Sequence, residues 1–114
     1  MWEYKTVAEA MAYTRENFDA VQSAYPNKQV IITEAGWATA SNGRGIPPEN
    51  VGELFQETYL RELLDWAEEE EILVYIFEAF DENWQGSDHP LEPEKHWGTY
   101  RADRSGTPAL SLQL

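Results

Sequence analysis

The sequence contains no cysteine and few basic residues. Without cysteine, a disulfide framework and a thiolate site are both excluded, and the sequence does not indicate a redox compartment. Eight Lys and Arg stand against 21 Asp and Glu, so the formal net charge is 8 − 21 = −13. This charge repels nucleic acid and anionic membrane surfaces, so we expect neither as a partner. A neutral ligand fits the charge better.

Long apolar runs are also missing. No run approaches the roughly 20 residues that span a bilayer, and the N-terminus lacks the basic-then-apolar pattern of a signal peptide. We therefore expect a soluble chain without an export signal, and its localisation stays unassigned. The composition is that of a globular protein, with 42% hydrophobic and 13% aromatic residues. A length of 114 residues provides at most one domain.

The stretch Gln29–Trp37, QVIITEAGW, combines an apolar run with a carboxylate. The run predicts a strand over Gln29–Thr33 that is buried on both faces, as in a parallel sheet covered by helices. Glu34 follows at the carboxyl end of this strand, where reactive groups gather in such sheets and barrels. From this stretch alone, a solvated strand end with an acid facing water remains an equal alternative.

A helix is predicted before this strand. Thr6 and Glu9 have the spacing of a capping box at its start, and the pattern ends near Tyr25, before Pro26. Its apolar stripe consists of Val7, Ala10, Met11, Thr14, Phe18, Val21 and Tyr25.

A second helix is predicted after a loop over Ala38–Pro48, which is long enough to form part of a rim over a site. Pro47 and Pro48 suit its first turn, and the acidic run Glu68–Glu71 is interpreted as its solvated end. The expected buried face consists of Val51, Leu54, Phe55, Thr58, Tyr59, Leu63, Trp66 and Ala67.

A second buried strand is predicted over Ile72–Phe80, ILVYIFEAF, and Thr107–Leu114 has the length of a last helical turn. The order is helix, strand, helix, strand, which predicts an α/β fold with two parallel strands joined by a right-handed crossover. Two strands leave unpaired edges, so the pattern indicates part of a larger sheet.

Carboxylates gather around the ends of both strands. Glu34 belongs to the first strand, and Glu78, Asp81 and Glu82 belong to the second, with Glu94 further along the loop. If the strands are parallel neighbours, these acids open on the same rim and should shift one another's pKa values. This is the arrangement that acid and nucleophile chemistry requires.

Aromatic residues are interleaved with these acids: Trp37, Trp84, Trp97 and Tyr100. Flat aromatic faces beside hydrogen-bonding acids suit a sugar ring. For each tryptophan taken singly, packing in the core or in a loop remains the alternative.

The motif ITEAGWAT at 32–39, followed by FEAFDENWQGSDHPLEPEKHWGTY at 77–100, resembles the C-terminal part of family 17 glycoside hydrolases. These are β-1,3-glucanases and related glucan-modifying enzymes with a retaining (β/α)8 barrel. The resemblance implies that residues 1–114 are a single C-terminal segment of a TIM barrel, containing about strands 7 and 8. The first helix would be the sixth of the barrel.

The resemblance also implies roles for individual residues. Glu34 would be the catalytic nucleophile at the end of the seventh strand. Glu82 and Glu94 match acids that hold and polarise the site, and Trp84 and Trp97 match aromatic residues of its wall. The expected substrate-binding residues are Trp37, Glu78, Glu82, Trp84, Glu94 and Trp97. The expected ligand is a β-glucan oligosaccharide, with β-1,3-glucan as the leading expectation, and no cofactor is implied.

Two departures from the family pattern matter. Gln85 stands where many relatives have a lysine. The chain is also much shorter than the roughly 250 residues of a barrel and lacks the fourth strand, which carries the family's acid/base. A retaining mechanism needs two carboxyls about 5 to 5.5 Å apart, so we expect the isolated chain to be inactive. We also expect it to associate with copies of itself or with the missing barrel half.

Other interpretations stay open. The sequence is also compatible with a non-catalytic carbohydrate-binding piece or a purely structural barrel fragment, natural or engineered. Linkage specificity, exo or endo cleavage, and hydrolysis against transglycosylation are also undecided by the sequence.

Metal sites are not expected. Asp81, Asn83, Gln85, Gly86 and Glu92 approximate a calcium-loop spacing. However, a strand precedes this segment, and the prolines at 90 and 93 prevent the usual exiting helix. The two histidines, at 89 and 96, have no third ligand at a spacing typical of zinc sites.

Overall fold

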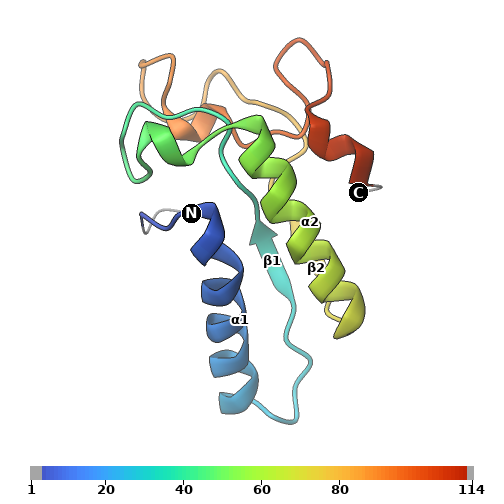
Figure 1. Cartoon of the computed structure of the whole chain (residues 1–114). Coiled ribbons are helices and arrows are strands. Elements are labelled where there is room, and N and C mark those ends of the chain that lie inside the picture. Colours follow the sequence, from blue (N-terminus) through green and yellow to red (C-terminus); the bar gives the residue numbers. More distant parts are fainter. Residues whose placement is uncertain (1–3, 113–114) are drawn as a thin grey trace.

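The computed structural model describes residues 4–112. Helix α1 (Val7–Ala24) is followed by strand β1 (Ile32–Ala35), helix α2 (Glu53–Glu69) and strand β2 (Val74–Ile76), as Figure 1 shows. β1 and β2 pair in parallel as a two-stranded sheet, with an irregularity in the register. The predicted order of elements and the parallel pairing are therefore confirmed.

Both strands are shorter than predicted. β1 begins at Ile32 and ends at Ala35, later than the expected Gln29–Thr33, so it includes Glu34. β2 covers only the middle of Ile72–Phe80. The ladder of hydrogen bonds between two strands continues only while the neighbouring strand remains in place as a partner. The chain after β2 turns to another partner, because the N–H of Glu78 donates to the carbonyl of Trp97 at 3.2 Å.

The start of α1 has the predicted capping box. The Glu9 carboxylate accepts hydrogen bonds from the backbone N–H and the hydroxyl of Thr6, both at 2.9 Å. Of the predicted stripe, Ala10 and Met11 are fully buried, whereas Val21 near the far end is 47% exposed. Only the first half of α1 therefore packs as tightly as the periodicity predicts.

The start of α2 differs from the prediction. Pro48–Asn50 form a separate 3₁₀ turn, η1, and α2 begins only at Glu53. Between them, Gly52 has a φ of 151°, a conformation that favours glycine and interrupts the helix. Pro47 therefore caps η1 and Pro48 begins it, so neither proline lies in the first turn of α2.

The buried face of α2 is also rotated relative to the prediction. Leu54 is 70% exposed, whereas Gln56 and Leu60 are buried. The prediction omitted these two residues because one is polar and the expected face began too early. At the end of the helix, Glu68–Glu71 are exposed, as predicted. Within residues 4–112, no helix is both long enough and apolar enough to cross a membrane.

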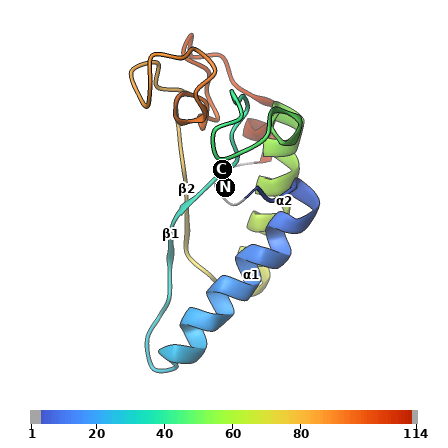
Figure 2. The same cartoon turned by 90° about the vertical axis from the view of Figure 1, so that its left-hand side faces the viewer.

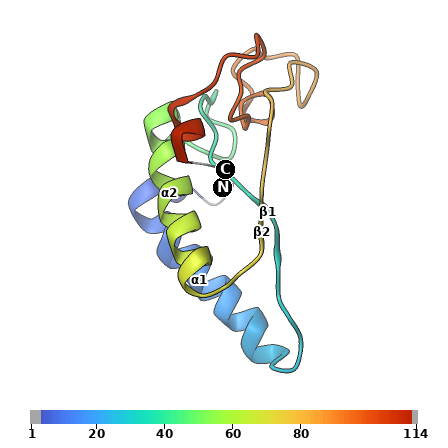
Figure 3. The same cartoon turned by 90° about the vertical axis from the view of Figure 1, so that its right-hand side faces the viewer.

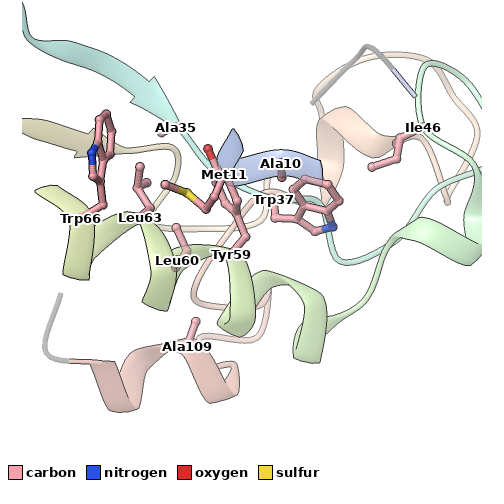
Figure 4. Close-up of a cluster of buried hydrophobic side chains, with 10 residues drawn as sticks. All are labelled: Ala10, Met11, Ala35, Trp37, Ile46, Tyr59, Leu60, Leu63, Trp66 and Ala109. Carbon is pink, nitrogen blue, oxygen red and sulfur yellow. The ribbon is translucent and has the colours of Figure 1, made fainter. Parts of the chain in front are cut away.

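The core lies between the two helices and one face of the strands. Figures 2 and 3 show α1 and α2 on the same side of β1 and β2. Phe18 of α1 meets Trp66 of α2 edge to face at 5.4 Å between ring centroids. The predicted last turn at Thr107–Leu114 is confirmed by the 3₁₀ turn η3 (Pro108–Leu112), which packs against α2, and residues 113–114 lie outside the described part of the chain. Figure 4 shows the buried cluster of Ala10, Met11, Ala35, Trp37, Ile46, Tyr59, Leu60, Leu63, Trp66 and Ala109.

The other face of the strands is open. Ile31, Leu73 and Tyr75 are 41%, 47% and 55% exposed, whereas the alternating residues Val74 and Ile76 pack against the core. The prediction that the strands are buried on both faces is therefore wrong, because both helices cover the same side. The radius of gyration, 14.3 Å, exceeds the about 13 Å expected for a closed domain of this length.

Candidate active site

The carboxyl ends of β1 and β2 open on the same side, as the parallel pairing requires. Glu34 lies in β1 and is exposed. Glu78, Asp81 and Glu82 follow β2, where the Phe77–Glu78 peptide bond is cis. Glu34 and the acids after β2 therefore lie at the same end of the strand pair.

Four of these acids lie close enough to interact electrostatically. Burial raises the pKa of Glu78 to about 7, and the negative charges of Glu82, Asp81 and Glu94 add to the effect. Among the described residues, no group donates a hydrogen bond to the buried Oε1 of Glu78. The acids at 78, 81, 82 and 94 thus form one cluster, in which Glu78 holds its proton close to neutral pH.

Gln85 contacts this cluster. Its Nε2 donates to Oε2 of Glu82 at 2.9 Å. A neutral amide therefore takes the position beside the acid, and the cluster keeps its negative charge.

The loop between Glu82 and Lys95 is fixed by buried charged groups. The Lys95 ammonium donates to the carbonyl oxygens of Asn83 at 2.8 Å and Gln85 at 2.6 Å. Glu92, only 1% exposed, accepts hydrogen bonds from Arg44 at 3.3 Å and from Ser87. The Glu92 carboxylate is thus engaged in contacts that hold the loop. Separately, within residues 4–112 no group of three or more His, Cys, Asp or Glu residues could hold a metal ion.

His96 joins this loop to the end of β2. Its Nε2 lies 2.8 Å from the carbonyl oxygen of Pro90, and its Nδ1 lies 3.7 Å from Oδ2 of Asp81. The hydrogen bond with Asp81 raises the pKa of His96, which burial partly opposes. The other oxygen of Asp81 accepts the N–H of Gly98 at 2.9 Å. When it is protonated, the imidazole can donate to the carbonyl of Pro90 and form an ion pair with Asp81.

A cavity of about 430 Å³ lies beside β1 and contains Glu34. Its volume falls within the range of small-molecule sites. It is lined by Tyr13, Thr14, Ile32, Glu34, Ala35, Gly36, Tyr59, Phe77, Glu94 and Trp97. Glu34, Glu94 and Trp97 thus share one cavity, which adds an apolar wall to two carboxylates.

The three candidate tryptophans have different surroundings. Trp37 is fully buried in the core, where its Nε1 donates to the carbonyl of Asn50 and its ring lies 5.4 Å from Tyr59. It has no surface for a sugar in this structure, so the alternative of core packing holds for this residue. Trp97 is 6% exposed and lines the cavity, and Trp84 is 74% exposed.

Three residues that organise this region were not expected from the sequence. Gln56, Lys95 and His96 fix the loops through hydrogen bonds to backbone groups or to Asp81. A glutamine within the apolar stripe of a helix is a signal that could have been noticed. The loop residues carry no comparable periodic signal.

A two-helix, two-strand unit with acids and a cavity at one strand end is consistent with part of a carbohydrate-active α/β enzyme. Residues 1–98 match the family described as the BtgE/BtgC glycoside hydrolase domain, and the chain belongs to this family. No curated protein matches the sequence.

Solved structures of family 17 enzymes are similar to this chain. The β-1,3-glucanosyltransferase of Rhizomucor miehei superimposes with a TM-score of 0.79 and 28% identity over 95% of this chain. An active-site mutant of the same enzyme, in complex with laminaritriose, gives the same values. An endo-laminarinase from Formosa gives a TM-score of 0.85 and 27% identity over 91% of this chain. The resemblance to family 17 is therefore confirmed.

This chain spans only part of those enzymes. It covers 38% of the length of the glucanosyltransferase and 28% of the endo-laminarinase. The fold is accordingly similar to part of a glycoside hydrolase barrel.

Proposed function

We propose that this chain carries the nucleophile side of a β-1,3-glucan hydrolase or transglycosylase site, with Glu34 as the nucleophile. The observation that supports it most directly is the cavity that Glu34 shares with Glu94 and Trp97. In this proposal, β1 and β2 are strands 7 and 8 of a (β/α)8 barrel, whose active sites lie at the carboxyl ends of the strands.

The proposed chemistry is that of a retaining glycosidase. The Glu34 carboxylate attacks the anomeric carbon and forms a glycosyl–enzyme ester, while an acid protonates the leaving oxygen. Water or a sugar hydroxyl then attacks the anomeric carbon, the conjugate base of that acid takes its proton, and the Glu34 carboxylate leaves, which gives hydrolysis or transfer. Glu82 and Glu94 bind sugar hydroxyls, Glu78 donates a hydrogen bond while protonated, and Trp97 and Trp84 provide apolar surface.

The acid/base is proposed to lie on a strand outside these 114 residues. The isolated chain is then expected to bind laminaritriose without cleaving laminarin. The choice of ligand is supported by the laminaritriose complex of the glucanosyltransferase.

The test combines binding and turnover. Laminaritriose is titrated by isothermal calorimetry into the chain, Glu34→Gln, Glu82→Gln and Glu16→Gln, the last of which alters an exposed acid on α1. Weaker binding in Glu82→Gln, but not in Glu16→Gln, supports the site, and absence of binding by the unsubstituted chain contradicts it. Laminarin cleavage that Glu34→Gln abolishes would show that the chain carries its own acid.

The open face of the strands favours a second proposal, a structural or carbohydrate-binding piece that associates with itself or with the rest of a barrel. The exposed Ile31, Leu73 and Tyr75 form an apolar strip along a sheet that, within residues 4–112, contains only β1 and β2 and so leaves one edge of each strand unpaired. Sedimentation should then show a mass that rises with concentration, and Tyr75→Lys should reduce it. A monomer at all concentrations argues against self-association.

A further inference from the structure

Gln56 lies on the buried face of α2, and its side chain is fully buried. Its Nε2 donates toward three carbonyl oxygens, those of Trp37 at 3.2 Å, Trp97 at 3.4 Å and Gly98 at 3.0 Å. Its Oε1 accepts the hydroxyl of Thr107 at 2.7 Å. Both ends of the amide are therefore engaged, as a buried polar group requires.

These partners come from three segments that are remote in sequence. Trp37 follows β1, Trp97 follows the 3₁₀ turn η2 (Pro93–Lys95), and Thr107 precedes η3. The first two segments also meet directly, because the N–H of Thr39 donates to the carbonyl of His96 at 2.8 Å. Gln56 thus ties the loops at the strand ends to the body of the molecule.

The backbone around this amide has little room to shift. A Cβ on Gly36 would overlap the carbonyl oxygen of Phe77, and a Cβ on Gly98 would overlap the backbone N–H of Asp81. The segments around Gly36 and Gly98 therefore both touch the backbone of the segment after β2, at Phe77 and Asp81. Because these contacts are between backbone atoms, a displacement of one segment displaces the others.

The junction lies close to the carboxylates of the cavity. Glu34 precedes Trp37 by three residues, and Glu94 precedes Trp97 by the same number. Gln56 does not line the cavity, so it has no direct contact with a ligand there. We propose that Gln56 is a positioning residue, which sets the separation between Glu34 and the wall formed by Glu94 and Trp97. This inference rests on the function proposed above.

The variants separate positioning from stability. Gln56→Leu keeps approximate volume and removes the donor, so the three carbonyls lose a partner. Gln56→Glu keeps the shape and regains a donor only when its carboxyl is protonated. Leu60→Ala is the matched control, because Leu60 is a buried residue of the same helix that belongs to the apolar core.

The measurement is a ¹H–¹⁵N NMR titration with laminaritriose, which reports the affinity together with the amide chemical shifts of Gly36 and Gly98. Gln56→Leu is expected to weaken binding about tenfold or more and to shift both amides, since misplacement by an ångström is costly at such sites. Leu60→Ala is expected to lower stability and leave the affinity within about twofold of the unsubstituted chain, because it spares these loop contacts. Gln56→Glu should bind weakly at pH 7 and recover, relative to the unsubstituted chain at each pH, as its carboxyl is protonated.

Equal affinity in Gln56→Leu and Leu60→Ala would overturn the positioning role, as would a Gln56→Glu variant with no recovery at low pH. If the unsubstituted chain fails to bind laminaritriose, the proposed function fails instead. The amide resonances of Gly36 and Gly98 then still test whether Gln56 fixes the loops at the strand ends. Unchanged resonances in Gln56→Leu contradict this role, and shifted resonances support it.

Discussion

The base of the molecule and the loops above the strand ends are stabilised by different contacts. In the base, Leu60, Leu63 and Trp66 of α2 pack against α1 and one face of the strands. In and around the loops, the buried residues include polar and charged ones: Ser41, Gln56, Glu92, Lys95, Thr99 and Thr107. Apolar burial is non-directional, whereas a hydrogen bond requires a defined geometry and leaves a costly orphan when broken. The base therefore supplies stability, and the loops supply geometry.

The largest effect is expected from a cavity in the base. Leu63 is fully buried, so Leu63→Ala should lower the free energy of unfolding by about 3 kcal/mol. The loop amides should keep their chemical shifts, because the folded loops retain their partners. Urea denaturation and NMR measure the two quantities.

Leu54→Ala is the control for this change, because Leu54 lies on the same helix and is 70% exposed. It should cost less than about 0.5 kcal/mol. Widespread shifts of the loop amides in Leu63→Ala would break the division between base and loops.

A smaller effect is expected from the loop lysine. Lys95→Met retains the apolar stem and removes the donor for the carbonyls of Asn83 and Gln85. We expect a loss of about 1–2 kcal/mol, concentrated in the loop. Hydrogen exchange should become faster at the amides of residues 82–96 and remain unchanged in α1.

Lys28→Met, at an exposed position, controls for the change in net charge. If it accelerates loop exchange as much as Lys95→Met does, then charge rather than the hydrogen bonds fixes the loop.

The smallest effect is a pH dependence confined to the loops. The unfolded chain releases the Glu78 proton near the ordinary pKa of 4.5, whereas the folded chain keeps it until about 7. The free energy of unfolding therefore falls as pH rises through this window. A fully buried group would lose about 1.4 kcal/mol for each unit of pKa difference, and Glu78 should lose only a fraction of this because it is only partly buried. Glu78→Gln should flatten the fall in melting temperature between pH 5 and pH 7.

His96 also makes stability fall as pH rises, but here the folded state favours the charged form of the side chain, whereas in Glu78 it disfavours the charged form. Its pKa is raised by Asp81, so its stabilisation is fully present below the unfolded value of 6.5 and is lost as pH rises through the folded value. His96→Asn should remove the part of the pH dependence above pH 6.5. A profile identical to that of the unsubstituted chain in both variants would contradict the assignment.

Most of the base could be predicted from the sequence, because its contacts are periodic. The capping box of Thr6 and Glu9 and the apolar spacing of both helices are local patterns, and they predicted the order and pairing of the elements. Two predictions for the base failed. The late start of α2, after Gly52, depends on a backbone conformation, and the open strand face depends on which side of the strands the helices lie. Neither is encoded in hydrophobic spacing.

The loops could be predicted only in part. The acids were expected on one rim, and Glu34, Glu94 and Trp97 line one cavity. Trp37 was expected beside a sugar and lies in the core, because a tryptophan near a strand end serves either purpose. The contacts of Gln56 and Lys95 join residues ten or more positions apart through single hydrogen bonds, which no sequence period reveals.

The open strand face, with Ile31, Leu73 and Tyr75, has a consequence for how the chain behaves at high concentration. At neutral pH, the net charge of −13 keeps copies apart by mutual repulsion. That protection disappears near the isoelectric point of about 4.3, where the acids are half neutralised. The fall in pH that protonates Glu78 and His96, and so favours the folded loops, is therefore the same change that removes the charge shielding the exposed strip.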